Sequence, residues 1–288
     1  MKLGINTFLF CSPFANPNLS LLPVFAEWGF DCAEIAIEDP GLVDGDTING
    51  AFKRSGLSHL ITCGAYGPGR DLRGSQADQE AAVSYTTRVL DMMPAYGSTL
   101  YCGPLYSAVG RAEAYTESEK ALQRELVALH LYKLASYAAD RDITIAMEVL
   151  NRFETDFLNT AAQAVEMVEQ VNHPNLGIHL DTFHMNMEER SFTEAIHTAG
   201  KHLAHLHASA NHRGAPGQGT IPWEAVRDAL TEIGYAGDVV IESFSTRIET
   251  IARACCVWRD PGDPETIARE GLAYLREVFE YRTPNKQR

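Results

Sequence analysis

The sequence predicts a single (β/α)8 barrel over residues 1–288, because short apolar segments alternate regularly with segments of helical period. Eight such apolar segments occur, which matches the strand number of this closed barrel, and a barrel of this kind takes about 250 residues. The expected strands are LGIN from Leu3, CAEIAI from Cys32, SHLITCG from Ser58, TLYCG from Thr99, ITIAMEV from Ile143, LGIHLD from Leu176, LAHLHA from Leu203 and DVVIES from Asp238.

Apolar residues at three- and four-residue spacing between these strands predict amphipathic helices packed around the barrel. The clearest helices are expected at Gln76–Tyr96, Glu117–Asp140, Ala161–Val171, Trp223–Ile233 and Glu265–Tyr281. Three loops rich in glycine and proline follow Pro68, Asn211 and Arg259, and we interpret them as elaborations of one barrel rather than as linkers.

An open, doubly wound sheet is the competing architecture. It typically carries a G-x-G-x-x-G or Walker phosphate loop after its first strand. Neither motif follows the strand that begins at Leu3. The barrel is therefore favoured, because it also accounts for the number of strands.

The composition limits the classes of partner. Lys and Arg number 24 against 38 Asp and Glu, which gives a net charge of -14, and the basic residues are scattered, so we expect no nucleic-acid partner. No segment reaches about 18 consecutive apolar residues, and polar residues interrupt the N-terminal MKLGINTFLFCSPF, so neither a membrane span nor a secretory signal is predicted. The six cysteines lack zinc-ribbon or redox spacing, which favours reduced thiols in a cytoplasmic protein.

Four consecutive strands each end near one potential metal ligand. Glu148 closes ITIAME, Asp181 closes LGIHLD, His207 closes LAHLH and Glu242 closes DVVIE. The carboxyl ends of all strands in a parallel barrel meet at one mouth. The sequence therefore predicts one metal site at the C-terminal ends of strands five to eight.

Each of these residues also has a purely structural interpretation. Asp181 precedes Thr182 and could be the N-cap of a following helix, and a single histidine such as His207 is often a core residue. Glu148 and Glu242 end strands rich in Ile, Val and Met, where an unpaired carboxylate would cost several kcal/mol. The coincidence of all four residues at equivalent positions favours the metal site.

Three carboxylates and one imidazole without a thiolate favour one divalent ion of near-octahedral geometry. Mn²⁺ is the first choice, with Co²⁺ or Mg²⁺ as alternatives, over a closed tetrahedral zinc. Two coordination positions would then be free for adjacent carbonyl and hydroxyl oxygens of a small sugar. Such an ion would polarise the carbonyl and stabilise an enediolate.

A second set of polar residues follows the predicted ligands. Glu154 lies six residues after Glu148, His184 three after Asp181, and Arg213 six after His207. Singly, each fits a solvated loop, but together they are expected to bind substrate oxygens above the metal. His179 and His205 share strand parity with the ligands Asp181 and His207, so both are expected to point inward one layer deeper in supporting roles.

Several stretches resemble a known family of sugar isomerase and epimerase barrels. They are EVLNRFE, LDTFHMNMEE, HLHASANHRG, VIESF and CCVWRD. The chain is most similar to the ketose 3-epimerases that act on D-tagatose, D-psicose (D-allulose) and L-ribulose. The resemblance spans nearly the whole chain and is most distinctive in LDTFHMN and in the spacing of Glu148 and Glu154.

This resemblance implies an isomerase that inverts C3 of a free keto sugar through a cis-enediolate. Glu148 and Glu242 would be the acid and base on opposite faces of C3 as well as metal ligands, and Glu154, His184 and Arg213 would surround the substrate oxygens O1 and O2. We also expect a homo-oligomer, a dimer or a tetramer.

Two loops depart from the family pattern and leave the sugar open. Ala210, Asn211 and His212 precede Arg213 where many members carry Glu-x-Asn-Arg or Glu-x-Asp-Arg, and the loop GPLYSAVGR has no tryptophan. One alternative is the catalytic subunit of a C-glycoside deglycosidase, which acts on 3-oxo-glucosides with a small partner subunit. Another is a non-catalytic sugar-binding barrel, although every expected catalytic residue is present. A three-zinc endonuclease would need more histidines and a positive face.

Overall fold

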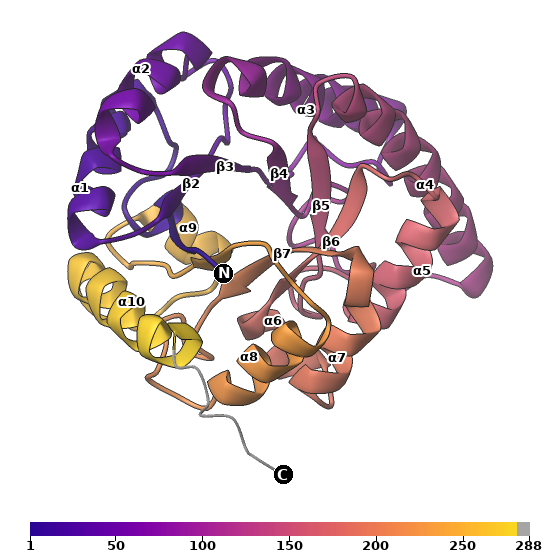
Figure 1. Cartoon of the computed structure of the whole chain (residues 1–288). Coiled ribbons are helices and arrows are strands. Elements are labelled where there is room, and N and C mark those ends of the chain that lie inside the picture. The colour runs from indigo at the N-terminus through magenta and orange to yellow at the C-terminus, as the bar shows by residue number, and fades with distance from the viewer. Residues whose placement is uncertain (281–288) are drawn as a thin grey trace.

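The computed structural model describes residues 1–280 as eight parallel strands that close into a barrel in the order β1 to β8 (Figure 1). The strands are β1 (Leu3–Asn6), β2 (Cys32–Ala36), β3 (His59–Cys63), β4 (Leu100–Gly103), β5 (Thr144–Glu148), β6 (Leu176–Asp181), β7 (Leu203–Ala208) and β8 (Val239–Ile241). All eight predicted strands are present, and the predicted (β/α)8 barrel is confirmed.

The barrel closes where β1 pairs with β8, with Ile5 opposite Ile241. Nearly every strand residue is buried on both faces, since the strands enclose a packed interior and are covered by helices outside. This double burial is the reason why the strands are largely apolar along both faces instead of alternating between apolar and polar residues.

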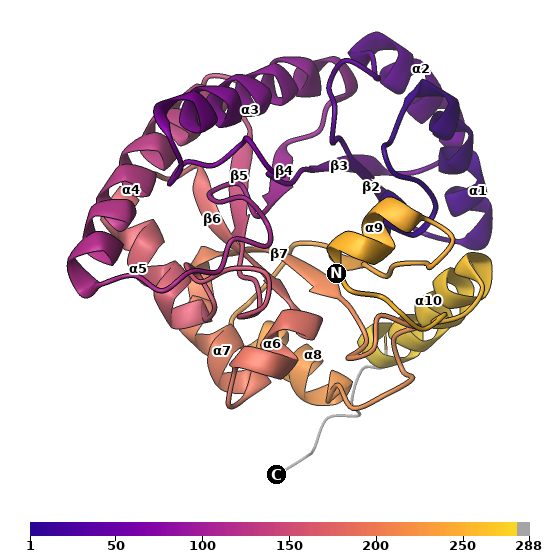
Figure 2. The same cartoon turned by 180° about the vertical axis from the view of Figure 1, so that it is seen from behind.

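A ring of helices surrounds the strands (Figures 1 and 2). They are α1 (Leu21–Trp28), α2 (Gly45–Ser55), α3 (Gln76–Tyr96), α4 (Glu117–Ala139), α5 (Ala161–Val171), α6 (Thr182–Glu188), α7 (Phe192–Ala199), α8 (Trp223–Glu232), α9 (Glu249–Ala254) and α10 (Pro264–Glu280). Two predicted helices end one residue early, because Asp140 and Ile233 are the C-caps of α4 and α8. Of the predicted last helix, Tyr281 lies outside the described residues.

The starts of three long helices follow from their capping sequences. Ser75, Thr116 and Thr160 each accept a hydrogen bond from the backbone three residues later, and a polar side chain at that later position bonds back. This reciprocal capping satisfies backbone N–H groups that have no partner within the helix.

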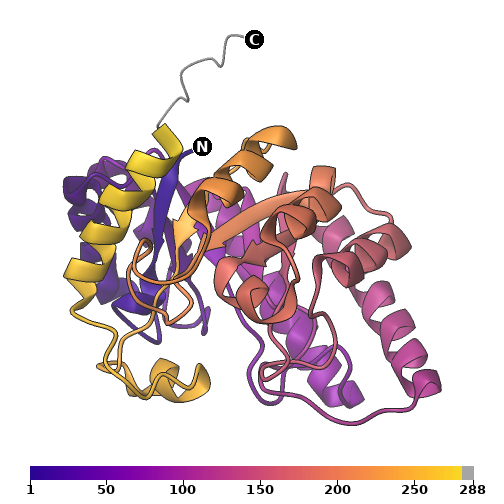
Figure 3. The ribbon, with the colours of Figure 1, turned by 90° about the horizontal axis from the view of Figure 1, so that it is seen from below.

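The short helices α6 and α9 lie inside the outline of the ring, over the barrel (Figure 2). From the side, α9 lies beyond one end of the barrel, and the first residues of the chain lie at the other end (Figure 3). The loops after the strands therefore cover the carboxyl ends, where the predicted site residues lie. Among the described helices, none is both long and apolar enough to cross a membrane. All six cysteines are free.

Candidate active site

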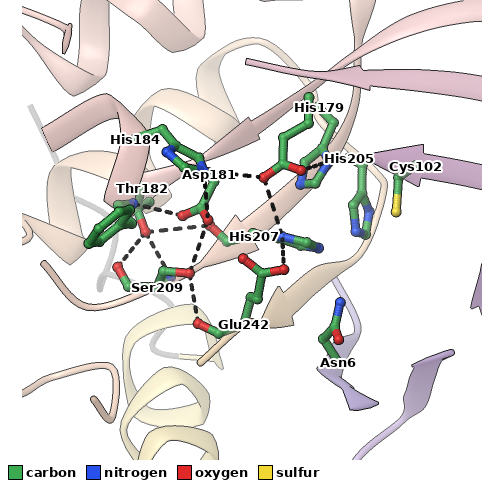
Figure 4. Close-up of polar contacts among 12 residues, drawn as sticks. Asn6, Cys102, His179, Asp181, Thr182, His184, His205, His207, Ser209 and Glu242 are labelled. Atoms are coloured by element: carbon green, nitrogen blue, oxygen red, sulfur yellow. Dashed lines mark hydrogen bonds and ion pairs between the residues drawn. The ribbon is translucent and has the colours of Figure 1, made fainter. Parts of the chain in front are cut away.

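The four predicted ligands Glu148, Asp181, His207 and Glu242 lie together at the carboxyl end of the barrel. Each offers one ligand atom, and these atoms all lie within 4.8 Å of one another. Strand register produces this arrangement, because Asp181 on β6 lies opposite His207 on β7, and Glu242 directly follows β8. Figure 4 shows Asp181, His207 and Glu242 directed toward one another.

The donor set fits a divalent cation. Nδ1 of His207 is buried and has no hydrogen-bond partner among the described residues, and it lies 3.5 Å from Oε1 of Glu242 and 3.9 Å from Oε1 of Glu148. All four residues are at most 5% exposed. Three buried carboxylates around an unpaired imidazole nitrogen are the arrangement that a metal ion satisfies.

The two glutamates of the cluster have opposite electrostatic environments. Burial raises the pKa of Glu148 well above its usual value, and the charge of Glu242 raises it further. Burial also acts to raise the pKa of Glu242, but the positive charges of His207 and Arg213 and a hydrogen bond from His207 outweigh burial and lower this pKa to about 2. The two environments thus shift the two pKa values in opposite directions, as is common for a pair of carboxyl groups that act as acid and base.

Asp181 caps α6 and also lies against the other predicted ligands. Its Oδ1 accepts a hydrogen bond of 2.7 Å from the backbone of Phe183 and caps α6. Its Oδ2 faces the other site residues and accepts from Arg213 at 2.8 Å. The structural and the ligand interpretations are therefore compatible, since they use different oxygens.

Arg213 lies against two of the predicted ligands. Its Nη1 donates to Oδ2 of Asp181 at 2.8 Å and to Oε2 of Glu242 at 3.0 Å, while the rings of Phe183 and Phe244 lie 3.9 and 4.5 Å from the guanidinium. Its Nε is buried without a partner among the described residues. The φ of Arg213 is 61°, a left-handed conformation that side chains rarely adopt, and such strain is typical of functional loops.

His184 and Glu154 are held by Asn151, a residue that the sequence did not single out. The backbone N and Nδ2 of Asn151 lie 3.1 and 2.8 Å from Nδ1 of His184, and Nδ2 also donates to Oε1 of Glu154 at 2.7 Å. Because the backbone N–H can only donate, Nδ1 of His184 is the acceptor and its proton lies on Nε2. That Nε2 lies 3.6 Å from Oε1 of Glu148.

We expect Asn151→Ala to lower kcat/KM at least about tenfold, because a lost orienting hydrogen bond misplaces groups around a substrate. Metal content, measured by elemental analysis, should be unchanged, because the side chain of Asn151 is hydrogen-bonded to His184 and Glu154 and not to any of the four predicted ligands among the described residues. A drop in metal content instead would place His184 and Asn151 in the metal centre itself.

Glu34 of β2 is a second residue that the sequence did not reveal. It is wholly buried, and its carboxylate lies 2.8 Å from Nε2 of His207 and 2.7 Å from Nε2 of His205. Asn6 donates to it at 2.5 Å and Cys102 at 3.3 Å. The only sequence signal was one acidic residue inside an otherwise apolar strand.

His179 packs against the same histidines. Its ring centroid lies 4.0 Å from that of His207 and 4.8 Å from that of His205, both edge to face. His179 lies opposite His205 on the neighbouring strand, two residue pairs before Asp181 and His207, so both lie in the deeper layer that strand parity predicts. Burial lowers the pKa of His179 well below its usual value, so the ring is neutral.

A cavity of about 260 Å³ adjoins the cluster. Its polar wall is formed by Glu148, Glu154, His184, Arg213 and Glu242, and Phe8, Leu150 and Phe244 contribute apolar surface. A cavity near the lower end of the usual range for ligand sites is suited to a small molecule such as a monosaccharide.

Residues 22–278 match the model of the xylose isomerase-like TIM barrel family. The chain belongs to this family. It is 34% identical to the ketose 3-epimerase of Arthrobacter globiformis over 96% of both chains, and 34% identical to the L-ribulose 3-epimerase of Mesorhizobium japonicum over 95% of this chain and 93% of that one.

The solved structures agree with this membership. The D-allulose 3-epimerase from Methylomonas sp. in complex with D-allulose superposes with a TM-score of 0.90 at 28% identity, covering 96% of this chain and 97% of that one. Together with the full-length similarity to ketose 3-epimerases, this makes the chain a carbohydrate epimerase, an isomerase.

Proposed function

We propose that the protein is a metal-dependent ketose 3-epimerase that inverts C3 of a free keto sugar. The observation that carries this proposal is the position of Glu148 and Glu242, which lie in one buried cluster with Asp181 and His207 and line the same cavity. The similarity to ketose 3-epimerases over nearly the whole chain supports it.

Glu148, Asp181, His207 and Glu242 would hold one divalent ion. Their oxygen-rich donor set favours Mn²⁺, with Co²⁺ or Mg²⁺ as alternatives. When bound, the ion supplies Lewis-acid polarisation of the substrate carbonyl and stabilises negative charge that develops on its oxygens.

Inversion at C3 requires a base on one face of the carbon and an acid on the other. Glu242 would accept the C3 proton, which leaves a planar cis-enediolate, and Glu148 would return a proton from the opposite face. For the other epimer the two residues exchange roles.

Three neighbouring residues provide groups for the remaining sugar oxygens. The unpartnered Nε of Arg213 and the Nε2–H of His184 are donors, and Glu154 offers an acceptor at the same cavity. We assign them to the substrate oxygens O1 and O2, where they would fix the sugar plane between Glu148 and Glu242.

Arg213→Ala is expected to lower turnover about 10²-fold to 10³-fold, as for the loss of one donor to a developing charge. The variant should bind Mn²⁺ at least as tightly as the wild type, because removal of the guanidinium leaves Asp181 and Glu242 without their cationic partner. Kinetics together with Mn²⁺ titration measure both effects. Loss of the ion from this variant would show that Arg213 supports the metal centre instead of the substrate.

The proposed reaction is tested by incubating the Mn²⁺-loaded protein with ketohexoses, ketopentoses and a 3-oxo-glucoside while C3 is followed by NMR. We expect conversion of at least one ketose to its C3 epimer. Release of an aglycone from the 3-oxo-glucoside without ketose turnover would support a C-glycoside deglycosidase subunit, and sugar binding without any turnover would support a binding barrel.

We further propose a cytoplasmic homo-oligomer of two or four chains. Leu122, Leu129 and Tyr132 are at least half exposed and lie on one face of α4, and a contact between subunits would cover this apolar stripe. Free cysteines without a disulfide are typical of cytoplasmic proteins.

A further inference from the structure

We propose that Glu34 is a positioning residue of the metal centre, which accepts a hydrogen bond from the Nε2–H of His207 and thereby presents the Nδ1 lone pair of that ring to the cation. The inference rests on the metal site of the proposed function and adds to it a residue that touches neither the ion nor the substrate.

The first step is the place of Glu34 in the barrel. Its strand, β2, is separated from β7 by β8 and β1, so its contact with His205 and His207 crosses the barrel interior instead of running between neighbouring strands. Figure 4 shows His205, Cys102 and Asn6 on the side of His207 that faces away from Asp181. Glu34 therefore contacts the edge of the His207 ring that lies opposite the predicted ligands.

The second step is the hydrogen bonding of the carboxylate. Oε1 is bonded to His207 and Asn6, and Oε2 to His205 and Cys102, so each oxygen has two neighbours. The amide and the thiol donate in these contacts. An ionised carboxylate only accepts and has about four acceptor positions. The arrangement is therefore complete when both histidines carry their proton on Nε2 and donate it to Glu34.

The third step is the consequence for His207. A neutral imidazole carries one ring proton, so donation from Nε2 leaves Nδ1 as a lone pair. Nδ1 is the buried nitrogen that has no partner among the described residues and faces Glu148 and Glu242. Without Glu34, the ring is free to carry its proton on Nδ1, where an N–H would oppose the ion.

A carboxylate behind a metal-binding histidine fixes its tautomer and orientation and raises its basicity. In this fold the carboxylate comes from β2 through the barrel interior, which accounts for an acidic residue in the apolar sequence of that strand.

Glu34→Gln tests the inference, because glutamine keeps the shape but replaces one acceptor oxygen by an NH₂ donor. That donor is incompatible with at least one of the four groups that surround it, and in either orientation of the amide the negative charge beside Nε2 of His207 is lost, which lowers the basicity of the ring. We expect the affinity for Mn²⁺, measured by calorimetric titration at fixed pH, to fall about 10-fold to 100-fold. Turnover should recover largely when Mn²⁺ is raised to saturation.

Asp39→Asn is the matched control. It makes the same change of charge five residues away, at an exposed position whose Oδ1 accepts from the backbone of Gly41, which asparagine is also able to do. It should bind Mn²⁺ as the wild type does. If Glu34→Gln lowers the melting temperature of the metal-free protein but leaves Mn²⁺ affinity unchanged, Glu34 is a purely structural core residue and the inference is overturned.

A measurement on the wild type does not depend on the folding of any variant. In the Mg²⁺-saturated protein, long-range ¹H–¹⁵N NMR of the His207 ring should show a protonated Nε2 and an unprotonated Nδ1. A proton on Nδ1 would overturn the inference. The outcome is independent of the proposed reaction. Glu34 can set the metal affinity even if the protein epimerises no ketose. Conversely, the protein can epimerise C3 even if Glu34→Gln leaves its Mn²⁺ affinity unchanged.

Discussion

Glu148→Gln and Glu242→Gln should each reduce C3 epimerisation about 10²-fold to 10⁴-fold, the usual contribution of a general acid or base. Either substitution removes the group that serves one face of C3, so neither variant is able to complete an inversion. Glutamine keeps an oxygen that can face the ion, and the rates should be compared at saturating Mn²⁺ with metal content measured in each sample.

Solvent exchange separates the two roles. In D₂O the wild type should incorporate deuterium at C3 of its product, because a carboxyl that has taken the proton exchanges it with water. In Glu148→Gln, the ionised Glu242 is still able to remove and return a proton on its own face, so one epimer should exchange without inverting. The double variant should show neither exchange nor epimerisation.

The control for these variants is again Asp39→Asn, whose exposed carboxylate lies outside the cavity. It should leave both epimerisation and exchange unaffected. An epimerised product that keeps all of its C3 hydrogen would indicate hydride transfer or bond cleavage, and the two-carboxylate mechanism would then be wrong.

Much of this architecture could be predicted because the signals are local. A strand that is buried on both faces is a short apolar run, and each long helix has its own capping residues, so strand number and helix positions could be inferred from the sequence. The position of Glu148, Asp181, His207 and Glu242 at strand ends was equally informative, because the barrel brings all carboxyl ends to one mouth.

The residues that the sequence did not reveal depend on contacts across the fold. The partners of Glu34 on β7 lie 171 and 173 positions away in the chain, and no pattern within β2 indicates them. Asn151 meets His184 over 33 positions. Arg213 was expected above the metal site, but no sequence pattern indicated its left-handed backbone conformation or its contact with two of the predicted ligand carboxylates.

Asp181→Asn should weaken Mn²⁺ binding and abolish most of the stabilisation that the ion gives. Asparagine is still able to cap α6 through Oδ1, but the site loses one of three negative charges, and an amide nitrogen would oppose Nη1 of Arg213. At a Mn²⁺ concentration 100 times the dissociation constant, binding stabilises the wild type by about 2.7 kcal/mol, whereas a variant with about 100-fold weaker affinity gains only about 0.4 kcal/mol.

Thermal unfolding with and without Mn²⁺ measures this difference. Since 1 kcal/mol corresponds to about 2 to 4 °C for a chain of roughly this size, the Mn²⁺-dependent shift should be about 5 to 10 °C in the wild type and about 1 °C in Asp181→Asn. The shift is the relevant quantity, because loss of the bond to Arg213 also changes the stability of the metal-free variant.

Asp44→Asn provides the matched control. Asp44 is the N-cap of α2, and its Oδ1 accepts from the backbone of Thr47 at 2.8 Å, as Oδ1 of Asp181 accepts from Phe183 in α6. Both substitutions therefore alter an aspartate cap, but only Asp181 has a second oxygen directed at Arg213 in the metal cluster. We expect Asp44→Asn to keep the Mn²⁺-dependent shift in melting temperature of the wild type. If Asp181→Asn keeps the same shift, Asp181 is a helix cap and not a metal ligand.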